Sequence, residues 1–192
     1  MDRFAAAVAA IDAINAQDPT TVTVRGRTGP KELLHAELVT AWVERLEAHP
    51  SEPLLLAARA HHLRRWSLPR TSYPAGRVGY LRWRRALHDQ HATELGRLLA
   101  DAGYDGTTIA RAQAIVRKEG LGRDREVQVL EDALCLVFLE TQLTDVAARL
   151  DEPTLTRVLD KTVQKMSAAG RAAITELPLD AHAYALLRRA LT

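Results

Sequence analysis

Three histidines and one aspartate lie on four different predicted helices of this 192-residue chain: His35, His62, His91 and Asp132. An imidazole or carboxylate buried without a partner is costly, and a bound cation satisfies several such groups at once. A mixed nitrogen and oxygen donor set favours Mn, Fe, Co or Zn over Mg alone. Such a cation activates water for hydrolysis or, when it is iron, activates dioxygen. The four residues therefore predict a divalent transition-metal site.

A second group of residues concentrates cations and aromatic rings close to the predicted ligands. Arginine offers paired N–H donors to a phosphate or carboxylate, and tyrosine or tryptophan can stack on a base or cover a pocket. We therefore expect a small anionic substrate to bind here, with Lys161 and Lys165 as weaker candidates for added charge. The alternative is that the rings pack beneath the segment while the arginines are solvated or ion-paired. The predicted substrate-binding residues are Arg65, Arg70, Tyr73, Arg77, Tyr80, Arg82, Trp83 and Lys118.

Apolar side chains at helical spacing, broken by proline and glycine, predict the elements that would position these groups. The predicted helices cover residues 3–17, 32–48, 53–66, 80–102, 107–118, 124–143, 152–168 and 180–191. Residues 20–31 are predicted to form a loop with a short extended piece, and residues 67–80 to be irregular. Because no repeat or parallel-sheet pattern accompanies them, we predict an all-α fold, one helical bundle domain over residues 1–192.

Two consecutive histidines compete for the ligand position on the predicted helix 53–66. Neighbouring residues point about 100° apart on a helix, so His61 and His62 cannot face one point equally. Leu55, Ala58 and His62 fall on one stripe. This favours His62 as the ligand and His61 as a wall of the pocket, although the choice between them stays open.

The composition excludes several classes of protein. Hydrophobic residues make up 47% and charged residues 26%, as in a folded globular domain, and the net charge of +2 argues against a nucleic-acid partner. We identify no signal peptide, and no stretch reaches the roughly 18 apolar residues of a membrane span. The single cysteine, Cys135, lies in an apolar run, which predicts a buried thiol and a cytoplasmic protein. A homodimer formed through residues 180–191 is a further hypothesis.

The order of the predicted ligands resembles the HD domain, a helical superfamily of metal-dependent phosphohydrolases that includes some oxygenases. The resemblance implies that His35 is the first ligand and Asp132 the late aspartate, and that His61 and His62 stand where the family has adjacent His and Asp. His91 resembles an extra histidine with which some members bind a second metal. Because His62 replaces the bridging aspartate, three alternatives stay open: Glu131 substitutes for it, a single metal binds, or the register differs by one residue.

Nearly the whole chain also resembles an uncharacterised family of bacterial and fungal proteins known only as a domain of unknown function. This resemblance implies a fold but no activity. The segments that carry it are residues 57–66, 69–74, 79–84, 130–140 and 165–167.

Three functions agree with these patterns. The first is a metal-dependent phosphohydrolase acting on a nucleotide or a small phosphorylated metabolite, with Glu131 or Glu37 as general base. The second is an HD-type iron-dependent oxygenase acting on a small anionic substrate. The third is a non-catalytic helical binding module whose histidines are core or surface residues. The metal content of the purified protein separates the three, because iron favours the oxygenase, Mn, Co or Zn the hydrolase, and no metal the module.

Overall fold

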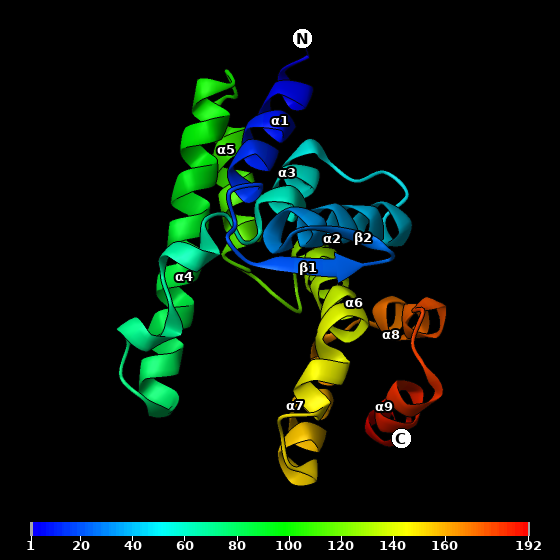
Figure 1. The fold of residues 1–192 in the computed structure, drawn as a ribbon. Coiled ribbons are helices and arrows are strands. Elements are labelled where there is room, and N and C mark those ends of the chain that lie inside the picture. The colour runs from blue at the N-terminus through cyan, green and yellow to red at the C-terminus, as the bar shows by residue number, and fades with distance from the viewer. Residues whose placement is uncertain (1, 192) are drawn as a thin grey trace.

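Helices form almost all of the regular structure in the computed structural model, which describes residues 2–191 and, within these, the side chains up to residue 188 (Figure 1). The α-helices in this range are α1 (Arg3–Asn15), α2 (Lys31–Leu46), α3 (Glu52–Ala60), α4 (Gly76–Asp101), α5 (Gly106–Val116), α6 (Arg125–Ala147), α7 (Glu152–Lys165), α8 (Ala168–Ala173) and α9 (Ala181–Leu191). Short 3-10 turns cover Arg65–Ser67, Arg70–Ser72 and Ile174–Glu176. This arrangement confirms the predicted all-α fold class.

A small antiparallel hairpin forms before α2, where a loop with a short extended piece was predicted. Its strands are β1 (Thr21–Val24) and β2 (Arg27–Pro30), and Thr21 pairs with Pro30. Arg25 and Gly26 both have positive φ, the backbone conformation that a two-residue turn with the right-handed twist of the strands requires. The hairpin leads directly into α2.

Side-chain caps explain where several helices begin. The Asp105 carboxylate accepts hydrogen bonds from the backbone N–H groups of Thr107 and Thr108 at the start of α5. Ser51, Asp124 and Asp151 cap α3, α6 and α7 in the same way. These residue types stabilise helix starts because their oxygens satisfy N–H groups that have no partner within the helix.

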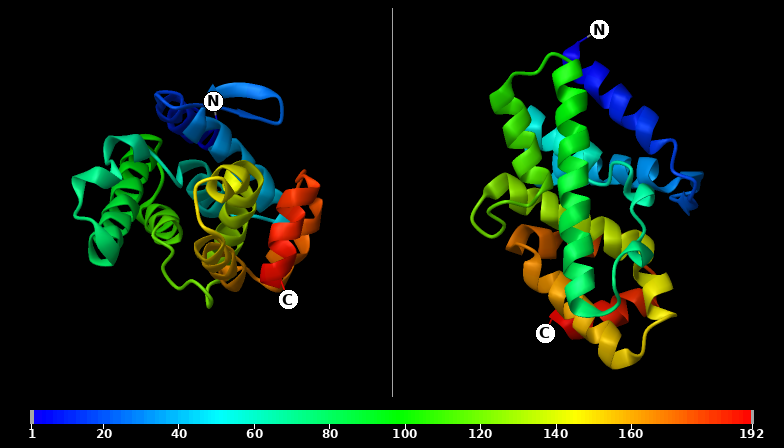
Figure 2. Two further views of the ribbon diagram at one scale, coloured as in Figure 1. Left: turned by 60° about the horizontal axis from the view of Figure 1, so that its bottom comes forward. Right: turned by 90° about the vertical axis from the view of Figure 1, so that its left-hand side faces the viewer.

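Helix α6 is the centre of the bundle. It packs against α2, α3, α5, α7 and α8. Leu130, Ala133, Leu136 and Leu139 on α6 are fully or almost fully buried. Figure 2 shows the long helix α4 running along one side of the molecule, where it packs against α5.

The prediction of one helix over residues 53–66 was wrong at its C-terminal end. Helix α3 ends at Ala60, and His61 begins a tight turn in which the N–H of Leu63 donates to the carbonyl of Ala60. Arg64 then takes a left-handed conformation with φ of 50°, which a continuing helix excludes. The stripe that favoured His62 over His61 therefore does not exist, because neither histidine lies within the helix.

The single cysteine, Cys135, is buried, as the sequence predicts. Burial raises the pKa of its thiol to about 12, which keeps the thiol protonated and unreactive.

Helix α9 packs against α7, and its apolar residues Ala183 and Leu187 are already buried within the chain. None of the helices in the described part of the chain combines the length and apolarity needed to cross a bilayer.

Candidate metal centre and its cavity

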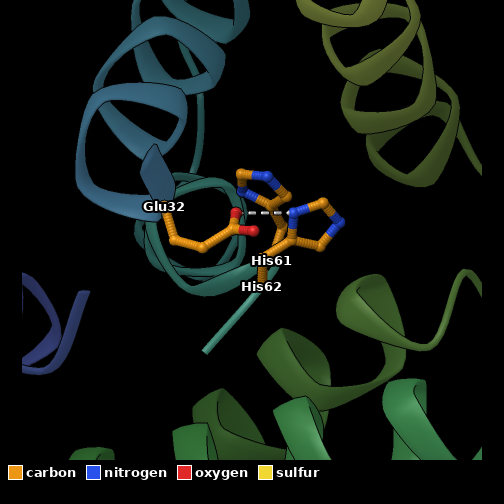
Figure 3. A group of neighbouring side chains, drawn as sticks. All are labelled: Glu32, His61 and His62. Atoms are coloured by element: carbon orange, nitrogen blue, oxygen red, sulfur yellow. Dashed lines mark hydrogen bonds and ion pairs between the residues drawn. The ribbon is translucent and has the colours of Figure 1, made fainter. Parts of the chain in front are cut away.

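A carboxylate and two imidazoles converge where α2 meets the end of α3. Glu32, His61 and His62 each offer one ligand atom, and these three atoms lie within 4.8 Å of one another. Figure 3 shows the Glu32 side chain reaching from α2 toward the two rings. The Nδ1–H of His62 donates a hydrogen bond to Oε2 of Glu32 at 2.9 Å. Two ligands at about 2.1 Å from one cation and at right angles to each other also lie about 3 Å apart, so a cation that replaced this hydrogen would meet a suitable spacing.

Local structure fixes each member of this cluster. Glu32 lies in the first turn of α2, where its backbone N–H donates to the carboxylate of Asp18 at 3.1 Å. The turn after Ala60 places His61 and His62 side by side, with ring centroids 4.2 Å apart. Arg65 follows this turn, with its Nε 3.9 Å from Oε1 of Glu32. The cluster thus depends on where α3 ends.

Two imidazoles are oriented by backbone carbonyls. Nδ1 of His61 lies 2.8 Å from the oxygen of Ala58, and Nδ1 of His91 lies 2.7 Å from the oxygen of Leu63. A carbonyl oxygen only accepts, so each Nδ1 carries the hydrogen and each Nε2 is left as the acceptor. Histidines that bind metals are commonly held in this manner. The Nε2 of His91 is buried with no hydrogen-bond partner among the described residues.

Burial keeps these imidazoles neutral. It lowers the pKa of His61 and of His62 well below the usual value, and the neighbouring Arg65 lowers that of His62 further. It also lowers the pKa of His91 to about 4, against the opposing hydrogen bond to Leu63. A histidine must be unprotonated to bind a metal, so all three are competent ligands at neutral pH.

The four predicted ligands are only partly brought together. The ring centroids of His62 and His91 are 5.8 Å apart, and both residues line the cavity described below. His35 is buried one turn after Glu32 on α2 and lines a different hollow, beneath the hairpin, with Thr141 and Gln142. His35 is outside the tight group of three donors. Burial lowers its pKa as well.

Asp132 has other partners. Its carboxylate accepts hydrogen bonds from the backbone N–H of Ser167 at 2.8 Å, from the Ser167 hydroxyl at 2.5 Å, and from Gln128 at 2.9 Å. A Cβ on Gly170 would lie only 2.6 Å from Cγ of Asp132. Helix α8 can therefore pack this closely against the carboxylate only because residue 170 is glycine. These contacts join α6 to the start of α8, and Asp132 is outside the group of donors formed by Glu32, His61 and His62.

A cavity of about 320 Å³ opens beside the cluster. It is bounded by α4, α6 and α7 together with the turn after α3, and it contains four cations and one carboxylate, Glu131. Leu87, Leu134 and Phe138 add apolar wall. The histidines in its lining are His61, His62, His88 and His91, and the cations are Arg65, Arg84, Lys118 and Lys165.

Three of the eight predicted substrate-binding residues line this cavity: Arg65, Tyr80 and Lys118. Trp83 instead donates from Nε1 to the oxygen of Leu68 at 2.9 Å, and Arg65 stacks over its ring at 5.3 Å from the centroid. The Trp83 ring therefore packs against the guanidinium of Arg65 instead of lining the cavity.

The other four lie either on residues 61–75, the connector between α3 and α4, or at exposed positions of α4. Arg70 donates to the carbonyl oxygens of Tyr73 and Pro74 at 2.9 and 2.8 Å, which holds the connector in shape. Tyr73 is half-buried, and Arg77 and Arg82 are exposed. None of the four is part of the cavity lining.

The two predicted general bases also differ in position. Glu131 faces the cavity, where Lys118 forms a close ion pair with it and Lys165 lies 3.5 Å away. Burial alone would raise the pKa of Glu131, but the two lysines outweigh burial and hold it below its usual value, which makes Glu131 a weak base. Glu37 pairs with Arg27 at 2.6 Å and lines a separate surface hollow.

Sequence reasoning missed Glu32 and Arg84. Glu32 precedes His35 by three residues, so the two share a helix face, and a carboxylate on the same face as a predicted ligand was the available signal. Arg84 lies one turn after Tyr80 on α4 and lines the cavity with it.

A model of one protein family matches residues 5–187, nearly the whole chain. The family is described as a domain of unknown function, DUF4202. The chain belongs to this family. No curated protein and no solved structure matches the chain significantly. Membership in this family therefore assigns no activity to the chain, and the residues of the site are the basis for a proposed function.

We expect Asp132→Asn to destabilise the protein by about 1–3 kcal/mol, because the Ser167 donors lose a charged acceptor in a buried place. Urea denaturation measures the change. Asp145→Asn, at an exposed position of the same helix, is the matched control and is expected to change little. Full stability combined with lost metal binding in Asp132→Asn would show that this carboxylate is a ligand after all.

The pKa of His91 also predicts acid sensitivity of the metal-free protein. The unfolded chain takes up a proton near pH 6.5 and the folded chain near pH 4, so stability present above about pH 6.5 is lost as the pH falls toward 4, by roughly 3 kcal/mol at most from this residue. Urea denaturation at about pH 7 and about pH 5 should show a smaller loss in His91→Gln than in the wild type. The exposed His49 provides the control, His49→Gln. Equal losses in all three proteins would contradict the assignment.

Proposed function

We propose that the protein is a metal-dependent phosphohydrolase acting on a small phosphorylated metabolite or a nucleotide. The observation that carries the proposal is the convergence of Glu32, His61 and His62 within 4.8 Å at the side of a cationic cavity. The resemblance of the histidine order to the HD domain supports the same reaction class. The proposed ligand set differs from that resemblance, since Glu32 takes the place of His35 and Asp132.

The donor chemistry supports a divalent transition metal. Two imidazoles and one carboxylate suit Mn, Fe, Co or Zn, and three protein ligands leave coordination positions open. A cation bound there would polarise a phosphoryl oxygen and lower the pKa of a coordinated water molecule. The cluster offers its three atoms without rearrangement of the backbone, because the turn after Ala60 already directs both rings to Glu32.

The surrounding residues supply the remaining functions of a hydrolase. The Nε2 of His91 has no hydrogen-bond partner among the described residues and belongs to the ring beside His62, so in the proposed mechanism it would orient the attacking water; its neutral state at pH 7 keeps it an acceptor. Arg65 lies over the Trp83 ring, 3.9 Å from Glu32, and lines the cavity, where it stabilises charge on the phosphoryl group. Leu87 and Phe138 shield the reacting groups from bulk water.

A specific observation favours a second candidate, an iron-dependent oxygenase. Two histidines and one carboxylate are also the ligand set of non-haem iron oxygenases. The donors Glu32, His61 and His62 fit that set equally well. We place the hydrolase first because the cavity contains four cationic side chains, which suit the charge of a phosphorylated substrate.

The test begins with metal binding. Protein purified without an affinity tag is stripped with a chelator and titrated with Mn, Co or Zn in a calorimeter. We expect one cation per chain in the wild type and an affinity at least 100-fold lower in Glu32→Gln, because loss of a ligand exceeds the roughly 10–100-fold effect of losing an outer partner. Glu44→Gln, an exposed position on the same helix, should bind like the wild type.

The reaction class is tested with the loaded protein. Phosphate release from a panel of nucleotides and sugar phosphates is expected from the wild type and from Glu44→Gln, and is expected to be lost in Glu32→Gln. Oxygen consumption with iron and no phosphate release would identify the oxygenase. A wild-type protein that binds no metal under any of these conditions would overturn both enzymatic candidates in favour of a non-catalytic binding module.

A further inference from the structure

A buried carboxylate in the cavity lies between two lysines from different parts of the chain. Glu131 on α6 is 4% exposed at its side chain, and it pairs closely with Lys118, which follows α5. Lys165, the last residue of α7, lies 3.5 Å from the other carboxylate oxygen. Arg84, reaching in from α4, lines the same cavity and acts electrostatically on Glu131.

The charges in this part of the cavity do not balance. Arg65 has its own partner, because Glu32 lies 3.9 Å from its Nε. Lys118, Lys165 and Arg84 then face the single carboxylate of Glu131. The imidazole of His88 beside Arg84 adds no charge, since burial lowers its pKa to about 4. The local excess of positive charge in a partly closed space attracts an anion with more than one negative charge.

Backbone structure holds both lysines in place. Lys118 has φ of 60°, a left-handed conformation that is uncommon outside glycine and that directs the chain sharply at the end of α5. The carbonyl of Lys165 accepts a hydrogen bond from Gln128 at 2.8 Å, and Gln128 also donates to Asp132. Asp132 in turn fixes Ser167, two residues after Lys165. Asp132, which is outside the group of Glu32, His61 and His62, therefore helps to fix the backbone at Lys165, one of the cations of the cavity.

We propose that Lys118, Lys165 and Arg84 form a binding subsite for a dianionic phosphate group, and that Glu131 fills it as an internal counter-ion in the ligand-free protein. An incoming phosphate replaces Glu131 as the partner of the lysines, because it offers two charges and three oxygens to three cations. Glu131 is then a residue that competes with the ligand. The subsite would select phosphomonoesters over neutral molecules and simple carboxylates.

The place of this subsite in catalysis rests on the proposed function, but the anion binding does not need a metal. Calorimetric titration of inorganic phosphate into chelator-treated protein measures it directly. We expect one phosphate per chain in the wild type, and binding weakened about tenfold or more in Lys165→Met. Lys161, the other lysine that the sequence offered as a weaker candidate, is exposed one turn earlier on α7 and is outside the cavity lining, so Lys161→Met removes the same charge and should bind like the wild type.

The decisive variant is Glu131→Gln. Removal of the competing carboxylate should tighten phosphate binding by about tenfold, whereas removal of a general base, a metal ligand or a purely structural group would not. Thermal melting of each variant checks that it is folded, and Lys165→Met, changed at an exposed side chain, decides the matter if Glu131→Gln unfolds. Equal affinities of Lys165→Met and Lys161→Met, or unchanged or weaker binding by folded Glu131→Gln, would overturn the proposal. Failure of the metal titration alone would leave this result standing.

Discussion

The arrangement of the site depends on the point at which α3 stops. A continuing helix would direct His61 and His62 about 100° apart, and only one could approach Glu32. The turn after Ala60 removes that restriction and places both imidazoles against one carboxylate. The same turn carries Arg65 to the side of Glu32 and provides the carbonyl of Leu63 that orients His91. One local break in a helix thus assembles groups from α2, α3 and α4.

Glu131 and Asp132, consecutive residues on the central helix α6, point in different directions and have different partners. Glu131 points into the cavity and meets the lysines, whereas Asp132 points toward the start of α8 and holds Ser167. Both are buried, and both are satisfied by donors of the chain itself. His91 differs, because its Nε2 is buried and has no partner within the part of the chain that the structure describes. A polar atom left in this state at the side of a cavity marks a place where a ligand or water is expected to bind.

The sequence predicts the helical fold well because residue types that break or cap helices mark where its helices begin and end. Proline, glycine and capping aspartates mark the boundaries around α2, α5, α6 and α7 within a few residues. The end of α3 was missed because Leu63 and Trp66 continue an apolar spacing typical of a helix. At the observed boundary, Nδ1 of His61 donates a hydrogen bond to the carbonyl of Ala58, and the backbone of Arg64 takes a left-handed conformation. Helix α8 was missed because a distant group, Asp132, fixes its first residues.

For the site, the structure brings together some of the residues that the sequence indicated. His62, His91, Arg65, Tyr80 and Lys118 do line one cavity. Asp132 was predicted as the carboxylate ligand because it matches the late aspartate of the HD pattern, whereas the packing of α6 against α8 directs it to Ser167. Contacts of this kind follow from tertiary structure, which periodicity alone does not encode.

We propose that Glu32, His61 and His62 bind one cation together. Anomalous diffraction from a crystal of metal-loaded protein, recorded at the absorption edge of the bound metal, locates that cation. We expect a single strong peak about 2.0–2.3 Å from a ligand atom of each of these three residues. A peak beside His35 or Asp132, or no peak from protein shown to contain stoichiometric metal, would contradict it.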